Sequence, residues 1–63
     1  MNSTERHTLL LAVLLDDGKT ARQLSAETGL KLNRVYLDLR ELEGEGRVLR
    51  EYIEGVSYWF ISH

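Results

Sequence analysis

The sequence predicts an α+β domain in which three helices precede a two-stranded β-hairpin. Two patterns carry this expectation. In the middle of the chain, Val35, Leu39 and Leu42 recur at the spacing of one buried helical stripe. The last segment is instead rich in β-branched and aromatic residues on either side of Glu54-Gly55, a two-residue connection typical of a tight hairpin.

The first helix is expected from about Ser3 to Leu15. Asn2 or Ser3 can cap its N-terminus, and Glu5 in the first turn complements the helix dipole. The turn sequence Asp16-Asp17-Gly18 ends the helix. Both ends of this element are therefore marked in the sequence.

The second helix is expected to begin at Thr20, because Thr20-Ala21-Arg22-Gln23 has the form of a capping box. Gly29 follows this helix and supplies the conformational freedom that a turn between helices needs. The third helix begins near Lys31, and Gly44 and Gly46 terminate it.

The hairpin is expected to pair residues 47–53 with residues 56–61. A turn at Glu54-Gly55 sets the register, since each residue then has one opposite partner. The expected pairs are Ile53 with Val56, Glu51 with Tyr58 and Leu49 with Phe60 on one face, and Tyr52 with Ser57, Arg50 with Trp59 and Val48 with Ile61 on the other. Both faces are apolar, so one is expected to cover the helices while the other leaves aromatic side chains exposed unless a second chain covers it.

Two helices joined by a short turn that contains glycine, the second of them longer, form a helix-turn-helix. Residues 20–28 are then the supporting helix and residues 31–44 the recognition helix, and a β-hairpin directly after the recognition helix is the wing of a winged helix. The predicted fold is therefore an α+β winged helix-turn-helix that occupies residues 1–63 as a single domain. The function that this order predicts is sequence-specific binding of double-stranded DNA by a small transcriptional regulator.

The formal net charge of -2 argues at first sight against a nucleic-acid partner. The charge is unevenly distributed, however. Residues 18–40 carry five basic residues against two acidic ones, whereas residues 41–63 carry two basic residues against five acidic ones. Because phosphate contacts are local and the Debye length at physiological salt is about 8 Å, a basic helix-turn-helix between acidic ends can still bind DNA.

The recognition helix leaves five residues opposite its apolar stripe. Among them, Arg34 can pair with guanine, Asn33 with adenine, and Leu37 can contact a thymine methyl group. Lys19 and Lys31, near helix starts, are expected to hold phosphates. The alternative for each of these residues is an ordinary solvated helix face. The full set of candidate DNA-binding residues is Lys19, Arg22, Lys31, Asn33, Arg34, Tyr36, Leu37 and Arg40.

An apolar surplus points to a protein partner as well. Residues 9–15 are apolar around the whole circumference of the first helix, and a two-layer domain can hide only part of that surface. The expected cover is a homodimer or a second regulatory protein, bound through Leu11, Leu15, Tyr58 and Phe60. The acidic wing, with Glu51 and Glu54, supports an alternative function: a winged-helix module for protein–protein interaction that does not read DNA.

Several other classes are disfavoured. There is no cysteine, and His7 and His63 stand alone near the two ends, so no catalytic or metal site and no small-molecule cofactor are expected; His7 is expected at the surface. Gly18-Lys19-Thr20 lacks the upstream glycine of a phosphate-binding loop. The longest apolar run, residues 9–15, is too short to span a membrane and has no signal-peptide flanks. A non-enzymatic cytoplasmic protein is expected.

Three motifs are similar to those of a known family. Gly18-Lys19-Thr20-Ala21, Leu42-Glu43-Gly44-Glu45-Gly46 with Val48, and Tyr58-Trp59-Phe60-Ile61 resemble the PapI/FaeA-like regulators of fimbrial operons in enteric bacteria. The resemblance implies a small winged-helix transcription factor that acts with a larger global regulator on the same DNA. It places Asn33, Arg34, Tyr36, Leu37 and Asp38 in the recognition helix.

The sequence departs from that family in two places. Its wing is shorter and is acidic where the family's wing carries arginines, and its first helix is more apolar. A phage or mobile-element regulator of similar build fits these features as well as a fimbrial regulator does.

Overall fold

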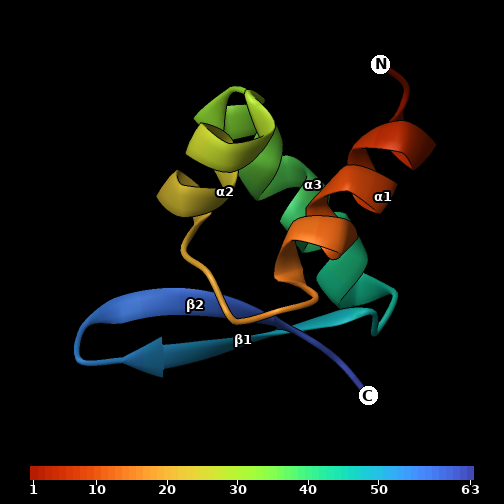
Figure 1. Cartoon of the computed structure of the whole chain (residues 1–63). Helices are drawn as coiled ribbons and strands as arrows, with labels where there is room; N and C mark the ends of the chain where they lie inside the picture. Colours follow the sequence, from red (N-terminus) through yellow and green to blue (C-terminus); the bar gives the residue numbers. More distant parts are fainter.

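The computed structural model describes residues 1–63 as three helices and a β-hairpin. In chain order these are α1 (Ser3–Leu14), α2 (Ala21–Thr28), α3 (Leu32–Gly44), β1 (Val48–Ile53) and β2 (Val56–Ile61). The helices lie on one side of the hairpin, whose tip extends beyond them (Figure 1). This layout confirms the predicted α+β fold of a winged helix.

The helix starts follow the local signals in the sequence. The Asn2 side chain accepts a hydrogen bond of 2.8 Å from the backbone N–H of Glu5, and the Glu5 carboxylate accepts one of 3.1 Å from Asn2 N–H. Thr20 and Gln23 form the same reciprocal pair at the start of α2, at 3.1 and 2.9 Å. Both capping boxes satisfy amides that the helix itself leaves unpaired.

The turn between α2 and α3 depends on a left-handed backbone. Gly29 has φ of 77°, a conformation that costs glycine little and other residues more. The Ser25 hydroxyl donates a 2.6 Å hydrogen bond to the Leu30 carbonyl across this turn. The turn thereby fixes where α3 begins, since Lys31 immediately precedes its first residue.

The hairpin has the predicted register in all six pairs, from Val48 opposite Ile61 to Ile53 opposite Val56. Its turn residues, Glu54 and Gly55, both have positive φ, as a tight primed turn requires. Lys19 adds a short third pairing on the far side of β2. Its N–H and C=O bond to the backbone of Trp59 at 3.0 and 2.8 Å.

The core lies between the helices and one face of the hairpin. The predicted stripe Val35, Leu39 and Leu42 is completely buried, and α1 contributes Leu10 and Leu14 to the same cluster. The other buried apolar residues are Ala21, Leu24, Val48 and Trp59. No helix of the structure combines the length and the hydropathy that a membrane crossing requires.

Candidate nucleic-acid interface

The side of α3 away from the core presents four of the predicted readers. Asn33, Tyr36, Leu37 and Arg40 are all exposed, and their spacing of three and four residues puts them on one continuous face. We call these four residues the recognition face. None of them is acidic. The opposite stripe of the same helix is buried in the core, so the core fixes the position of α3 while the recognition face stays accessible to a ligand.

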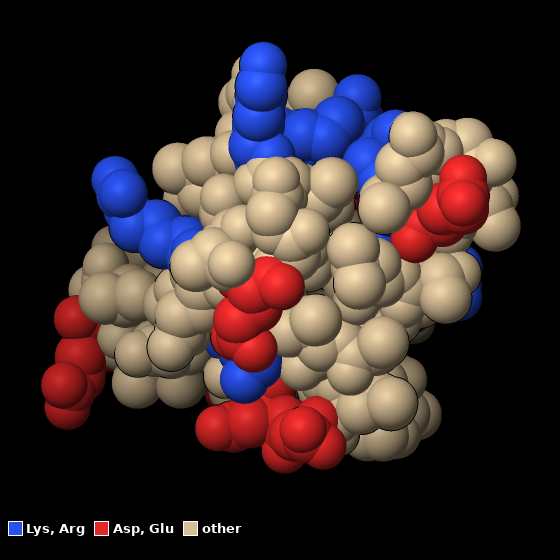
Figure 2. Space-filling model, turned by 45° about the horizontal axis from the view of Figure 1, so that its top comes forward, with Lys and Arg blue, Asp and Glu red and all other residues tan.

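Basic side chains surround the recognition face. Arg22 and Lys31 are exposed, at the start of α2 and just before α3. Lys19 is less available, because its Nζ lies 3.8 Å from a Glu27 carboxylate oxygen. Figure 2 shows most of the basic side chains of this face at its top and upper left, and acidic side chains at its lower edge, in its centre and at its upper right. The charges are therefore partly separated in space.

A cavity of about 440 Å³ lies at the N-terminal end of α3, with Arg6, Lys31, Asn33 and Arg34 among its lining residues. No side chain caps this helix end. The first-turn amides of α3 therefore have no intrahelical acceptor. Lys31 lies beside them without an ion-pair partner, whereas Arg6 and Arg34 are both bound to Asp38. Such an arrangement suits a phosphate group.

A second cavity, of about 290 Å³, separates α3 from the base of the wing. Its lining consists of Tyr36, Arg40, Glu43, Arg50 and Trp59. The Tyr36 ring meets Trp59 edge to face, with ring centroids 6.0 Å apart, which holds the tyrosine in place. Arg50 was not among the predicted DNA-binding residues. The predicted hairpin register placed Arg50 opposite Trp59, but it did not indicate which face covers the helices; in the structure this face does, since Trp59 and Val48 are buried.

Asp38 does not belong to the recognition face, although the resemblance placed it in the recognition helix. Its side chain is fully buried. One carboxylate oxygen accepts a 2.8 Å hydrogen bond from Arg6 Nε and the other a 3.0 Å bond from Arg34 Nη2. Asp38 follows Val35 by three residues and precedes Leu42 by four, so it lies on the core side of the helix. Arg34 is consequently held at the edge of the recognition face by a carboxylate.

The prediction that His7 is an ordinary surface residue is wrong. Its side chain is only 12% exposed, and its Nε2 lies 3.3 Å from Glu41 Oε1 and 3.7 Å from Asp38 Oδ1. The potential ligand atoms of these three residues lie within 4.8 Å of one another. The oxygens of Asp38 already bind two guanidinium groups, however, whose charges oppose a metal cation. The cluster therefore belongs to a polar network, centred on the ion pairs of Asp38 with Arg6 and Arg34, that joins α1 to α3.

Burial raises the pKa of the Asp38 carboxyl, but the hydrogen bond from Arg6 and the charges of Arg34 and Arg6 outweigh burial and hold the pKa below its ordinary value. A group whose pKa is lower in the folded state stabilises the fold above its unfolded pKa, about 3.9 for aspartate. That contribution is lost as the pH falls through the folded value.

We therefore expect the melting temperature of the wild type to fall more steeply below about pH 4 than that of Asp38→Asn, which has no carboxylate at this position. Thermal melts of both proteins between pH 7 and pH 2 measure the difference. Because the remaining carboxylates are common to both proteins, parallel pH profiles would contradict the role of Asp38.

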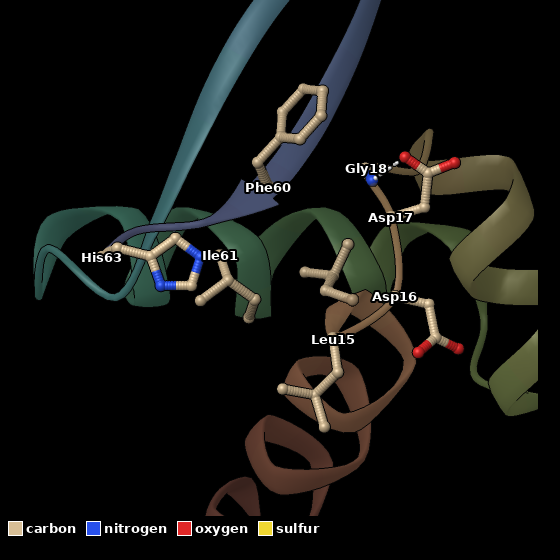
Figure 3. A pocket seen from close by; sticks show the side chains of 8 residues that line it. Leu15, Asp16, Asp17, Gly18, Phe60, Ile61 and His63 are labelled. Carbon is tan, nitrogen blue, oxygen red and sulfur yellow. Dashed lines mark hydrogen bonds between the residues drawn. The ribbon is translucent and has the colours of Figure 1, made fainter.

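The predicted partner residues lie at different depths. Leu15 is 73% exposed just after α1, whereas Leu11 is half-buried and packs against the core. Tyr58 and Phe60 are half-buried on the hairpin face that points away from the helices. The Phe60 ring lies beside Gly18 in the turn that follows α1 (Figure 3). Of the four, only Leu15 is a largely free apolar side chain.

No protein-family model matches this chain, and no curated protein matches its sequence. The similarity to PapI/FaeA-like regulators stays a prediction that rests on the three motifs.

Proposed function

We propose that this protein is a small sequence-specific DNA-binding transcriptional regulator that places α3 in the major groove. The observation that carries the proposal is the recognition face: four exposed residues without an acid, on a helix whose other side is buried, with cationic side chains around it. A helix in the major groove needs such a face to reach the base edges.

The residues divide by their chemistry into readers and anchors. Asn33 suits adenine, Leu37 suits a thymine methyl group, and Arg40 suits guanine or a phosphate. Lys31 and the uncapped first turn of α3 supply phosphate contacts at one end of the helix. Arg50 supplies a cation at the other end, across the cavity it shares with Arg40. Phosphate contacts at both ends would set the orientation in which the readers meet the bases.

The net charge does not oppose this function. The acids of the wing tip, Glu51 and Glu54, lie on the hairpin, and Asp38 within the apolar stripe of α3 is buried and paired. Glu43, near the C-terminal end of α3, is exposed, but it shares its cavity with Arg40 and Arg50, whose charges offset it. We expect modest affinity, because few cations make the contacts, and we expect the affinity to fall as salt rises, because each phosphate contact releases counterions.

The test begins with selection of bound duplexes from a random pool, followed by titration of the selected duplex at several salt concentrations. Arg40→Ala is expected to lower the affinity about 5- to 100-fold, the range for loss of a base or charged contact. The matched control is Arg47→Ala, which removes an exposed arginine 3.8 Å from Glu45 at the start of the hairpin. Failure to select any duplex, or equal affinities for the two variants, would contradict DNA reading by α3.

A second candidate function is a protein-interaction module with the same fold and no DNA reading. The exposed Leu15, Ile53 and Val56 and the acidic wing tip favour it. It predicts that substitutions on the hairpin disrupt a complex while Arg40→Ala does not. The two functions are compatible in a regulator that binds DNA together with a homodimer partner or a second regulatory protein. Sedimentation of the free protein measures self-association, and a dimer predicts half-sites about one helical turn apart, or a multiple of it.

A further inference from the structure

The hairpin face that points away from the helices is an apolar surface. Leu49, Ile53 and Val56 are each 40% exposed or more, and the half-buried Tyr58 and Phe60 lie beside them in the pairing register. We call these five residues the hairpin patch. The helices pack on the opposite face through Val48 and Trp59, so Leu49, Ile53 and Val56 stay exposed. The Phe60 end of the patch lies against Gly18 in the turn after α1.

Acidic groups occupy the middle and the ends of the hairpin patch. Glu51 stands between Leu49 and Ile53 on the same face of β1, and Glu54 lies at the turn. At the other end, Asp16 and Asp17 lie near Phe60 around a cavity of about 270 Å³ (Figure 3). The last turn of α1, which leads into that cavity, contains no basic residue to offset the negative end of the helix dipole.

The outer edge of β1 is unpaired. The sheet has two strands, and the additional pairing of Lys19 is with β2. The backbone N–H and C=O of Trp59 bond to Lys19 and therefore point away from β1. Arg50 and Trp59 are thus a non-hydrogen-bonded pair of the antiparallel ladder. The amides and carbonyls of Arg50 and, by alternation, Tyr52 therefore point outward from β1.

We propose that an extended segment of another protein adds to the edge of β1, with a lysine or arginine opposite Glu51 and large apolar side chains on either side of it. Backbone hydrogen bonds at Arg50 and Tyr52 would hold the segment, and its apolar side chains would cover Leu49 and Ile53. The Glu51 carboxylate, with the acidic groups at the two ends of the hairpin patch, favours a segment that carries a cationic side chain at this position. The same acids repel DNA and anionic membranes, and a second copy paired about the middle of β1 would bring two Glu51 carboxylates together.

The probe is the blocked peptide acetyl-Thr-Leu-Thr-Arg-Thr-Leu-Thr-amide, titrated into the full chain and followed by amide chemical shifts. We expect the shifts to concentrate at Arg50, Tyr52 and the hairpin patch. A peptide with glutamate in place of arginine is expected to bind about 3- to 10-fold more weakly, and the Glu51→Lys variant is expected to reverse that preference. Glu51 is exposed, so this variant keeps the fold.

Three results would overturn the proposal: equal binding of the two peptides, an arginine preference that Glu51→Lys leaves unchanged, or shifts confined to α2 and α3. A fourth contrary result would come from sedimentation over the same protein concentrations. If the protein forms a dimer, and if dilution to the monomer changes the amide shifts of the hairpin patch, the occupant is a second copy of the chain. The proposal does not rest on DNA binding, so a failure to select DNA leaves these outcomes unaffected.

Discussion

Replacing Asp38 with alanine is expected to lower the free energy of unfolding by about 2 to 4 kcal/mol, which corresponds to a fall in melting temperature of about 10 to 25 °C. The substitution leaves Arg6 and Arg34 without their shared carboxylate. Those side chains are 16% and 38% exposed, so water compensates in part, and the cost stays below that of breaking a completely buried pair. Circular dichroism melts and urea titrations measure the loss.

The matched control is Glu41→Ala. Its carboxylate is 54% exposed and lies 3.3 Å from His7, within the same network but at the surface. We expect a loss of no more than about 1 kcal/mol, as for other exposed ion pairs. If Asp38→Ala is as stable as Glu41→Ala, the Asp38 network does not join α1 to α3 in the way its geometry indicates.

Gly18→Ala is expected to destabilise the protein by about 1 to 3 kcal/mol, the usual cost of forcing extra volume into a packed site. A Cβ atom at this position would overlap the Phe60 ring, which lies against the glycine. The ring must move, and the neighbouring backbone pairing between Lys19 and Trp59 is then strained. Chemical denaturation and the amide shifts of residues 17–20 report both effects.

A double-mutant cycle with Phe60→Ala separates the ring contact from other effects. In that background Gly18→Ala is expected to be neutral or slightly stabilising, since alanine also reduces the conformational entropy of the unfolded chain. An unchanged cost of Gly18→Ala in the absence of the ring would show that the backbone, rather than Phe60, requires glycine at this position.

Local sequence signals predicted the elements closely because each depends on neighbouring residues. The two capping boxes join residues three apart, and the two-residue turn at Glu54-Gly55 is sufficient to set all six strand pairs. Only the boundaries moved. The structure ends α1 at Leu14, one residue before the predicted end, and begins β1 at Val48, one residue after the predicted start.

The recognition face was also predictable, because the apolar stripe of α3 determines which residues lie opposite. The Asp38 network was not. Arg6 and Asp38 are 32 residues apart, and no local pattern indicates that α1 places a guanidinium against α3. The partial burial of His7 and the position of Arg50 beside Arg40 also depend on the packing of distant elements.

The sequence by itself determined the order of the elements, their caps and the strand register, since these follow from side-chain periodicity and from hydrogen bonds over a few residues. The tertiary structure alone decided which charges are free. It buried Asp38 and paired it with Arg6 and Arg34, and it determined which hairpin face stays exposed, with Glu51 in the middle of its apolar patch. The physical reason is that the environment of a charge depends on distant elements brought together by packing, which the local sequence does not specify.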